Sequence, residues 1–190
     1  MTTDRWDREL REQLSFHWET QLRPRLEGLS DDEYFWEPVP GCWNIRPRGT
    51  GSAPIQVGGG DFTIDFAFPE PDPPPLTTIA WRLGHVIVGV LAARNAAHFR
   101  GPPTTYEGFD YAGTADAALA QLDEHYAAWQ AGVASLGDDG LDRPVGEAEG
   151  AHADYAYSVL VLQIRREMIH HLAEVCLLRD VYAHTPADQR

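Results

Sequence analysis

Segments with helical spacing of their apolar side chains most constrain the fold of this chain. In the first, Trp6, Leu10, Leu14 and His17 recur at three- and four-residue intervals, the spacing of one helix face. Each segment is twenty or more residues long, and long helices joined in one chain are typical of helical bundles. We therefore predict an all-α protein, a four-helix bundle. Its helices are expected at 7–26, from Thr77 or Thr78 to Phe99, at 114–136 and at 155–182.

The stretch between the first two predicted helices has a different composition. Residues 38–75 contain most of the prolines and the glycine-rich runs GTGS and GGG, which interrupt regular helices. Within this stretch FTIDFAF (62–68) alternates as a strand does, and it could pair with the segment near Ile55 and Val57. PEPDPPP (69–75) predicts a stiff, extended connector. We expect a long proline- and glycine-rich crossover insert that carries a short β-hairpin.

Length and composition indicate one globular domain. A chain of 190 residues can bury one core, and 43% hydrophobic with 23% charged residues is ordinary for a globular protein. We expect a single domain over 1–190. The formal net charge of −14 argues against binding to nucleic acid or to anionic membranes, because phosphate would be repelled.

Cysteine content and apolar runs point to the cytoplasm. Cys42 and Cys176 form no C-x-x-C pair, so thiolate zinc sites and thioredoxin-like chemistry are not expected. The N-terminal MTTDRWDREL is charged where a signal peptide is apolar. The longest apolar stretch, VIVGVLAA (86–93), is too short to span a bilayer. We predict a cytoplasmic protein.

The fourth predicted helix carries ionisable side chains where apolar ones are expected. In REMIHHLAEVCLLRD (165–179), Glu167 and His171 fall on the face that should be buried. They are four residues apart, so both side chains can reach one ion. His170 lies about 100° further round the helix, and we expect it at the rim of such a site or behind its ligands.

A histidine of the second predicted helix could complete the set. His85 lies on an apolar face of WRLGHVIVGVLAARNAAHF, four residues after Trp81. A buried carboxylate is costly unless it is paired or bound to a cation, and a buried imidazole needs partners for both nitrogens. His85, Glu167 and His171 are therefore predicted ligands of a divalent metal, Zn²⁺, Ni²⁺ or Fe²⁺.

Other interpretations stay open on the residues alone. His85 could be a hydrogen-bonded core histidine, and Glu167 with His171 could be a buried ion pair that fastens two helices. Glu167 and His170 also form one Glu-x-x-His step of the kind used by di-iron bundles. A di-iron site needs further glutamates on the bundle core, which makes that interpretation weaker.

These residues resemble the DinB-like superfamily of metal-binding four-helix bundles, in an actinobacterial-type subgroup. The resemblance covers nearly the whole chain and is carried by WRLGHVIVG and REMIHHLAEVCLLRDVY, with WEPVPGCWNIRPR and TIDFAFPEPDPPPLTTIAWRLGH. The superfamily includes thiol-dependent S-transferases and the mycothiol-dependent maleylpyruvate isomerase. Its metal triad is usually three histidines, which implies His85 and His171 here, with Glu167 at the middle position as a departure.

The resemblance implies an enzyme that acts on a small molecule. The expected activity is a metal-dependent S-transferase or isomerase that uses mycothiol or another small thiol, and Arg46 and Arg82 are predicted to receive an anionic group of the substrate. No catalytic residue is assigned. A catalytically silent bundle that binds a ligand or a partner is the alternative, its Glu167–His171 pair being structural. We also expect a homodimer, which is common among such bundles.

Overall fold

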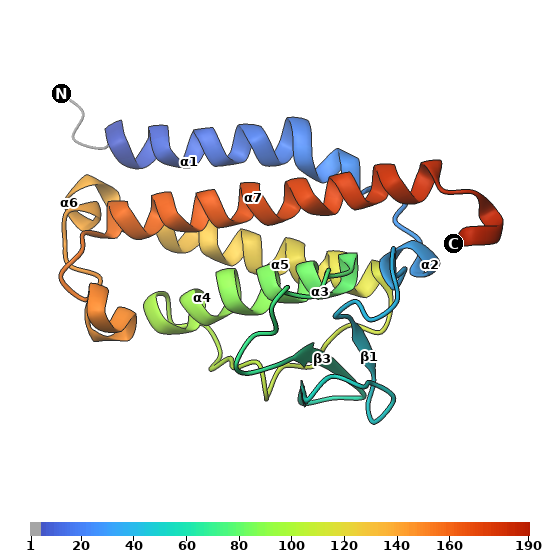
Figure 1. Ribbon diagram of the computed structural model, residues 1–190. Helices are drawn as coiled ribbons and strands as arrows, with labels where there is room; N and C mark the ends of the chain where they lie inside the picture. Colours follow the sequence, from blue (N-terminus) through green and yellow to red (C-terminus); the bar gives the residue numbers. More distant parts are fainter. Residues whose placement is uncertain (1–4) are drawn as a thin grey trace.

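The computed structural model describes residues 5–190, which are mostly helical with a small antiparallel sheet (Figure 1). The first helical run is followed by the short helix α2 (Asp31–Tyr34). Gly28, with a φ of +68°, lies in the turn between them, where a left-handed residue ends a helix. This run matches the predicted helix at 7–26. It comprises α1 (Arg5–His17), the π-helical η1 (Trp18–Leu22) and the 3₁₀ segment η2 (Arg23–Leu26).

The second run begins where the sequence predicts a helix cap. The Thr78 side chain accepts a hydrogen bond from the Trp81 backbone N–H at 3.2 Å, which satisfies a donor of the first turn. The residues that join its parts keep right-handed helical angles, so the run is continuous to His98. It consists of α3 (Ile79–His85), the π-helical η3 (Val86–Ala92) and α4 (Ala93–His98).

The remaining helices also follow the predicted order. Thr114 caps α5 (Ala115–Ala134) by accepting from the Ala117 N–H at 3.3 Å. The last long helix begins at Tyr157 rather than Tyr155, because Tyr155 accepts a backbone hydrogen bond from Val145 and belongs to the preceding turn. The elements after α5 are α6 (Gly137–Leu141), the 3₁₀ segment η4 (Glu147–His152), α7 (Tyr157–His184) and the 3₁₀ segment η5 (Ala187–Gln189).

The core lies between the long helices. In Figure 1, α1 and α7 run side by side above α5 and the α3–α4 run, and α3 and η3 contact both α5 and α7. Burial of apolar side chains between these helices is the main stabilising contribution. The largest fully buried side chains include Trp129, Leu122, Leu83, Leu91, Ile164 and Met168.

The insert forms a three-stranded antiparallel sheet beside α3. The predicted hairpin is present as β2 (Ile55–Val57) paired with β3 (Phe62–Phe66). A third strand that the sequence did not indicate, β1 (Ile45–Pro47), pairs with the other edge of β3. β1 has 3 residues, of which only Ile45 is buried, and a strand of this length is too short to show an alternating pattern.

Polar contacts tie the sheet to α3. The Asp65 side chain accepts hydrogen bonds from the Asn44 backbone N–H at 3.1 Å and from Arg46 Nε at 2.9 Å. Its backbone oxygen accepts from Trp81 Nε1 at 2.8 Å. Gly84 of α3 faces the buried strands, since a Cβ there would be 2.8 Å from Ile45 Cδ1. The sheet is therefore held against the start of the second helical run.

Cys42 and Cys176 are both free and buried. Within residues 5–190, no helix combines the length and the hydropathy that crossing a membrane requires.

Candidate metal site

His171 lies at the centre of a cluster of polar side chains on the middle of α7. The fully buried stripe of this helix passes through Ile164, Met168 and Leu172. The prediction that Glu167 and His171 occupy this stripe was therefore wrong, because the buried positions are the next residues along the chain, Met168 and Leu172. They lie at its edge, where the side chains of Glu167 and His171 are 32% and 16% exposed, so an ion and a small molecule could reach them.

His85 approaches His171 from α3. Their ring centroids are 4.7 Å apart and the rings are nearly perpendicular, at 80°. On its other side the His85 ring stacks on Trp81, with centroids 5.5 Å apart. The structure therefore brings His85 of α3 next to His171 of α7.

The two nitrogens of His171 face different carboxylates. Nε2 is 3.5 Å from Glu167 Oε2, and Nδ1 is 3.3 Å from Glu174 Oε2. The same Glu174 oxygen accepts from Arg82 NH1, which also lies 3.4 Å from His171 Nδ1. An arginine N–H can only donate, so Nδ1 and Arg82 both have a hydrogen bond if each donates to Glu174. In that arrangement Nε2 carries the lone pair and faces Glu167.

Tyr106 holds the His85 ring in a similar way. The Tyr106 hydroxyl is 2.8 Å from His85 Nδ1, which leaves Nε2 for another partner. Tyr106 can approach only because residue 89 is glycine, since a Cβ there would lie 2.0 Å from its hydroxyl oxygen. His85 is also the residue before the π-helical segment η3, and π-helical turns are frequent at functional sites.

The environment of His85 keeps its imidazole neutral. Burial lowers the pKa of His85 to about 4, and the neighbouring His171 acts in the same direction. Glu167 opposes this shift, while Arg82 and Arg94 add to it. A neutral imidazole near pH 7 is the form that binds a metal ion.

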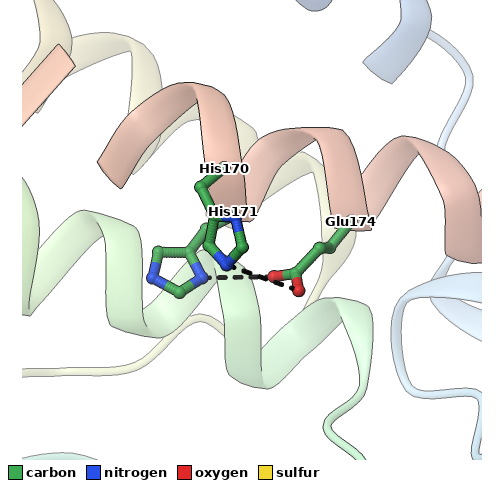
Figure 2. A group of neighbouring side chains, drawn as sticks. All are labelled: His170, His171 and Glu174. Carbon is green, nitrogen blue, oxygen red and sulfur yellow. Dashed lines mark hydrogen bonds and ion pairs between the residues drawn. The ribbon is translucent and has the colours of Figure 1, made fainter. Parts of the chain in front are cut away.

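A second candidate ligand group lies on α7 alone. Figure 2 shows His170, His171 and Glu174, whose ligand atoms all lie within 4.8 Å of one another. His170 Nε2 is 3.7 Å from Glu174 Oε1, but the His170 side chain is 64% exposed. This exposure agrees with the expected rim position. His85 and Glu167 are not members of this group, so their sharing of one coordination sphere with His171 stays a prediction.

An aromatic pocket opens beside His85. It has a volume of about 630 Å³ and lies between the sheet, the connector that follows β3, the start of α3 and the loop at 106–107. His85 and Tyr106 both line it, so a molecule in the pocket touches the site. The other lining residues are Trp43, Ile55, Val57, Phe66, Ala67, Phe68, Glu70, Trp81 and Glu107.

The predicted substrate-binding arginines are both engaged by carboxylates. Arg46 is 2.7 Å from Glu37 and 2.9 Å from Asp65, so its charge is already compensated. Arg82 pairs with Glu174 next to His171. Their predicted role in binding an anionic substrate is not favoured by these pairs and stays a prediction.

Sequence reasoning missed Glu174 and Tyr106. Glu174 follows His171 by three residues and His170 by four, so its helical spacing was a signal that could have been used. Tyr106 belongs to an irregular loop twenty-one residues after His85, and no periodicity relates the two. Only the folded chain brings Tyr106 to His85.

Comparison with known proteins assigns the chain to a family. A family model described as the DinB superfamily matches residues 13–175. Searches of curated proteins and of solved structures found no match. The match spans most of the chain, and it includes His85 on α3 and Glu167, His171 and Glu174 on α7. The chain belongs to the DinB superfamily.

Proposed function

We propose that this protein is a divalent-metal-dependent enzyme built on a DinB-type four-helix bundle. Its metal, Zn²⁺, Ni²⁺ or Fe²⁺, is held by His85, Glu167 and His171. The reaction is a transfer or isomerisation of a small molecule that uses mycothiol or another small thiol as co-substrate. The membership of the superfamily and the His/Glu cluster support the metal, and the thiol rests on the resemblance of the sequence motifs.

One observation carries the metal proposal: His171 Nε2 and Glu167 Oε2 lie 3.5 Å apart. If Nδ1 donates to Glu174, both facing atoms are electron-pair donors, and they repel each other unless a cation lies between them. Two ligand atoms about 2.1 Å from one ion at a tetrahedral angle are about 3.4 Å apart. The observed spacing therefore fits a shared ion.

The same logic applies to His85. Its lowered pKa keeps the ring neutral, so Nε2 carries the lone pair if Nδ1 donates its hydrogen to the Tyr106 hydroxyl. Metal-bound histidines usually have the second nitrogen fixed by such an outer partner. Tyr106 for His85 and Glu174 for His171 are residues of this kind.

A divalent ion in this site would lower the pKa of a bound water or thiol and so supply a nucleophile at neutral pH. The protein's own side chains orient the metal ligands and enclose the small molecule. Tyr106 and Glu174 fix the two imidazole rings, Arg82 compensates the Glu174 charge, and the aromatic pocket receives the small molecule beside His85.

The silent bundle is the second candidate, and the contacts of His171 give it some support. An imidazolium at this position would lie between the carboxylates of Glu167 and Glu174, and Arg82 would complete a network of charges. Charged N–H···O⁻ hydrogen bonds are normally about 2.7–2.9 Å long. The 3.5 Å between His171 Nε2 and Glu167 Oε2 is longer than such a hydrogen bond, which favours the metal proposal.

Matched histidine variants test the proposal. We would measure zinc, nickel and ferrous iron bound by protein purified without a histidine tag, for wild type, His85→Gln and His170→Gln. Ligands from two helices predict that His85→Gln loses the metal and that His170→Gln retains it. The reverse order would assign the ion to the His170, His171 and Glu174 group of α7.

Wild-type protein that binds none of these ions would refute the enzyme proposal in favour of the silent bundle. Melting temperatures of the same samples control for misfolding. Under the silent-bundle interpretation Glu167→Gln lowers the melting temperature, and added metal does not raise the melting temperature of the wild type. Under the metal proposal added metal raises it, because binding to the folded state alone is stabilising.

A further inference from the structure

The aromatic pocket beside His85 has a definite chemical character. Trp43, Phe66, Trp81 and Tyr106 contribute aromatic rings, and neighbouring centroids are 5.3 to 6.0 Å apart, as in Phe66–Tyr106 and Trp43–Phe66. Its volume of about 630 Å³ is within the range of small-molecule sites, roughly 300–1,000 Å³. The interior therefore suits a flat or compact apolar group.

Exposed apolar side chains extend this surface to the rim. Phe68 is 90% exposed and Ile55 is 37% exposed, and both line the same pocket. An exposed phenylalanine next to an aromatic pocket contributes apolar contact area to a bound molecule. A contiguous apolar surface of this kind is typical of a ligand site.

The charges at the rim are negative. Glu70 and Glu107 line the pocket from the connector after β3 and from the loop that carries Tyr106, and both are exposed. No arginine of the described residues lines the pocket, and the chain contains no lysine. The charge of Arg94 opposes the raised pKa of Tyr106, but Arg94 donates to the Gly89 carbonyl and is paired with Glu149.

We propose that this pocket binds a small organic cation, an ammonium group on an aromatic or alkyl body, and disfavours anions of the same size. The apolar body lies among the four aromatic rings, next to His85 and Tyr106. The ammonium group lies at the rim near Glu70 and Glu107, where aromatic side chains add cation–π attraction. The identification of the bound molecule as the substrate rests on the proposed function. The binding of the cation to the pocket does not depend on it.

This assignment reverses the charge expected from the sequence. Arg46 and Arg82 were predicted to receive an anionic group, but carboxylates of the protein engage both, and neither lines the pocket.

Three naphthalene derivatives of equal ring size test the proposal. We would measure the binding of 1-naphthylmethylammonium, 1-naphthylmethanol and 1-naphthoate by titration calorimetry at low ionic strength, with metal-free and zinc-treated protein. We expect the ammonium to bind at least about fivefold more tightly than the carboxylate, the effect of roughly one unit charge at about 4 Å in water. The difference should shrink in high salt.

Variants of exposed residues locate the effect. Glu70→Gln with Glu107→Gln should remove the preference for the ammonium and leave the affinity for the alcohol unchanged. The matched double variant Glu124→Gln with Glu147→Gln, at exposed positions that do not line the pocket, should keep the preference. Phe68→Ala should weaken all three ligands by a similar factor.

Equal or tighter binding of the carboxylate, a preference that survives Glu70→Gln with Glu107→Gln, or no binding of any of the three would overturn the proposal. A preference for the ammonium in protein that binds no metal would support the pocket assignment while refuting the metal-dependent function. Metal binding without any affinity for the naphthalene series would support the metal proposal and refute the pocket assignment.

Discussion

Replacing Glu174 with Gln tests how the protein holds His171. Glu174 Oε2 is 3.3 Å from His171 Nδ1 and also accepts from Arg82. Gln has the same shape and keeps one carbonyl acceptor, but it removes the charge that compensates Arg82. The Arg82 side chain is only 16% exposed, so its positive charge would remain poorly screened next to the metal.

Both consequences weaken metal binding. Loss of an outer partner of a metal-bound histidine typically lowers affinity by about tenfold to a hundredfold, which corresponds to about 1.4 to 2.7 kcal/mol. Because Glu174→Gln also leaves Arg82 without its carboxylate, we expect a value in the upper half of this range. Arg82→Gln in the Glu174→Gln background should recover part of the loss.

Zinc affinity would be measured by competition with a chromophoric chelator, alongside the melting temperature of the metal-free proteins. Glu124→Gln on α5 is the matched control, since it removes one exposed carboxylate of another helix, one that has no contact with His171 among those described above, and should leave the affinity unchanged. A dissociation constant of Glu174→Gln within twofold of both wild type and the control would refute this account of His171. A complete loss of metal, shared with His170→Gln, would make Glu174 a direct ligand.

Three further predictions concern the same site. Glu167→Gln should lower metal affinity more than Glu174→Gln, because it removes a charged ligand; equal dissociation constants from chelator competition would contradict this. Metal-free protein should lose up to about 3 kcal/mol of unfolding free energy between about pH 6.5 and 4, because the unfolded chain protonates His85 first whereas its pKa in the folded protein is about 4. Urea denaturation across this range checks the loss, which His85→Gln should largely remove. Gly89→Ala should displace Tyr106, whose hydroxyl oxygen would be 2.0 Å from the new Cβ, and weaken zinc binding by about tenfold in the same competition assay; an unchanged affinity would mean that Tyr106 has no part in holding His85.

The helices were predictable because their signals are local. Thr78 and Thr114 cap helices where the sequence indicated helix starts, and Gly28 ends the first helical run. Caps and apolar periodicity depend on neighbours within a few residues, so they can be read without the tertiary structure. The β2–β3 pairing was predictable for the same reason, whereas β1 was missed because its short strand has no alternation of its own.

The candidate ligands were predictable only in part. Glu167 and His171 could be paired because residues four apart lie on one side of a helix. Their exact burial could not be predicted, since the stripe that packs against the other helices passes through Met168 and Leu172. A shift of one residue turns a helix by about 100°, and only the packing of α7 on its neighbours decides it.

The sequence by itself determined the helical segments, the hairpin of the insert and three candidate ligands, His85, Glu167 and His171. Tertiary structure alone decided what surrounds them: Tyr106 on His85, Arg82 on Glu174, and an aromatic pocket with acidic residues at its rim. These contacts join residues that are far apart in the chain, and their distances depend on how the helices and the insert pack. Periodicity records which face of an element is buried, but it carries no information about which distant side chain that face meets.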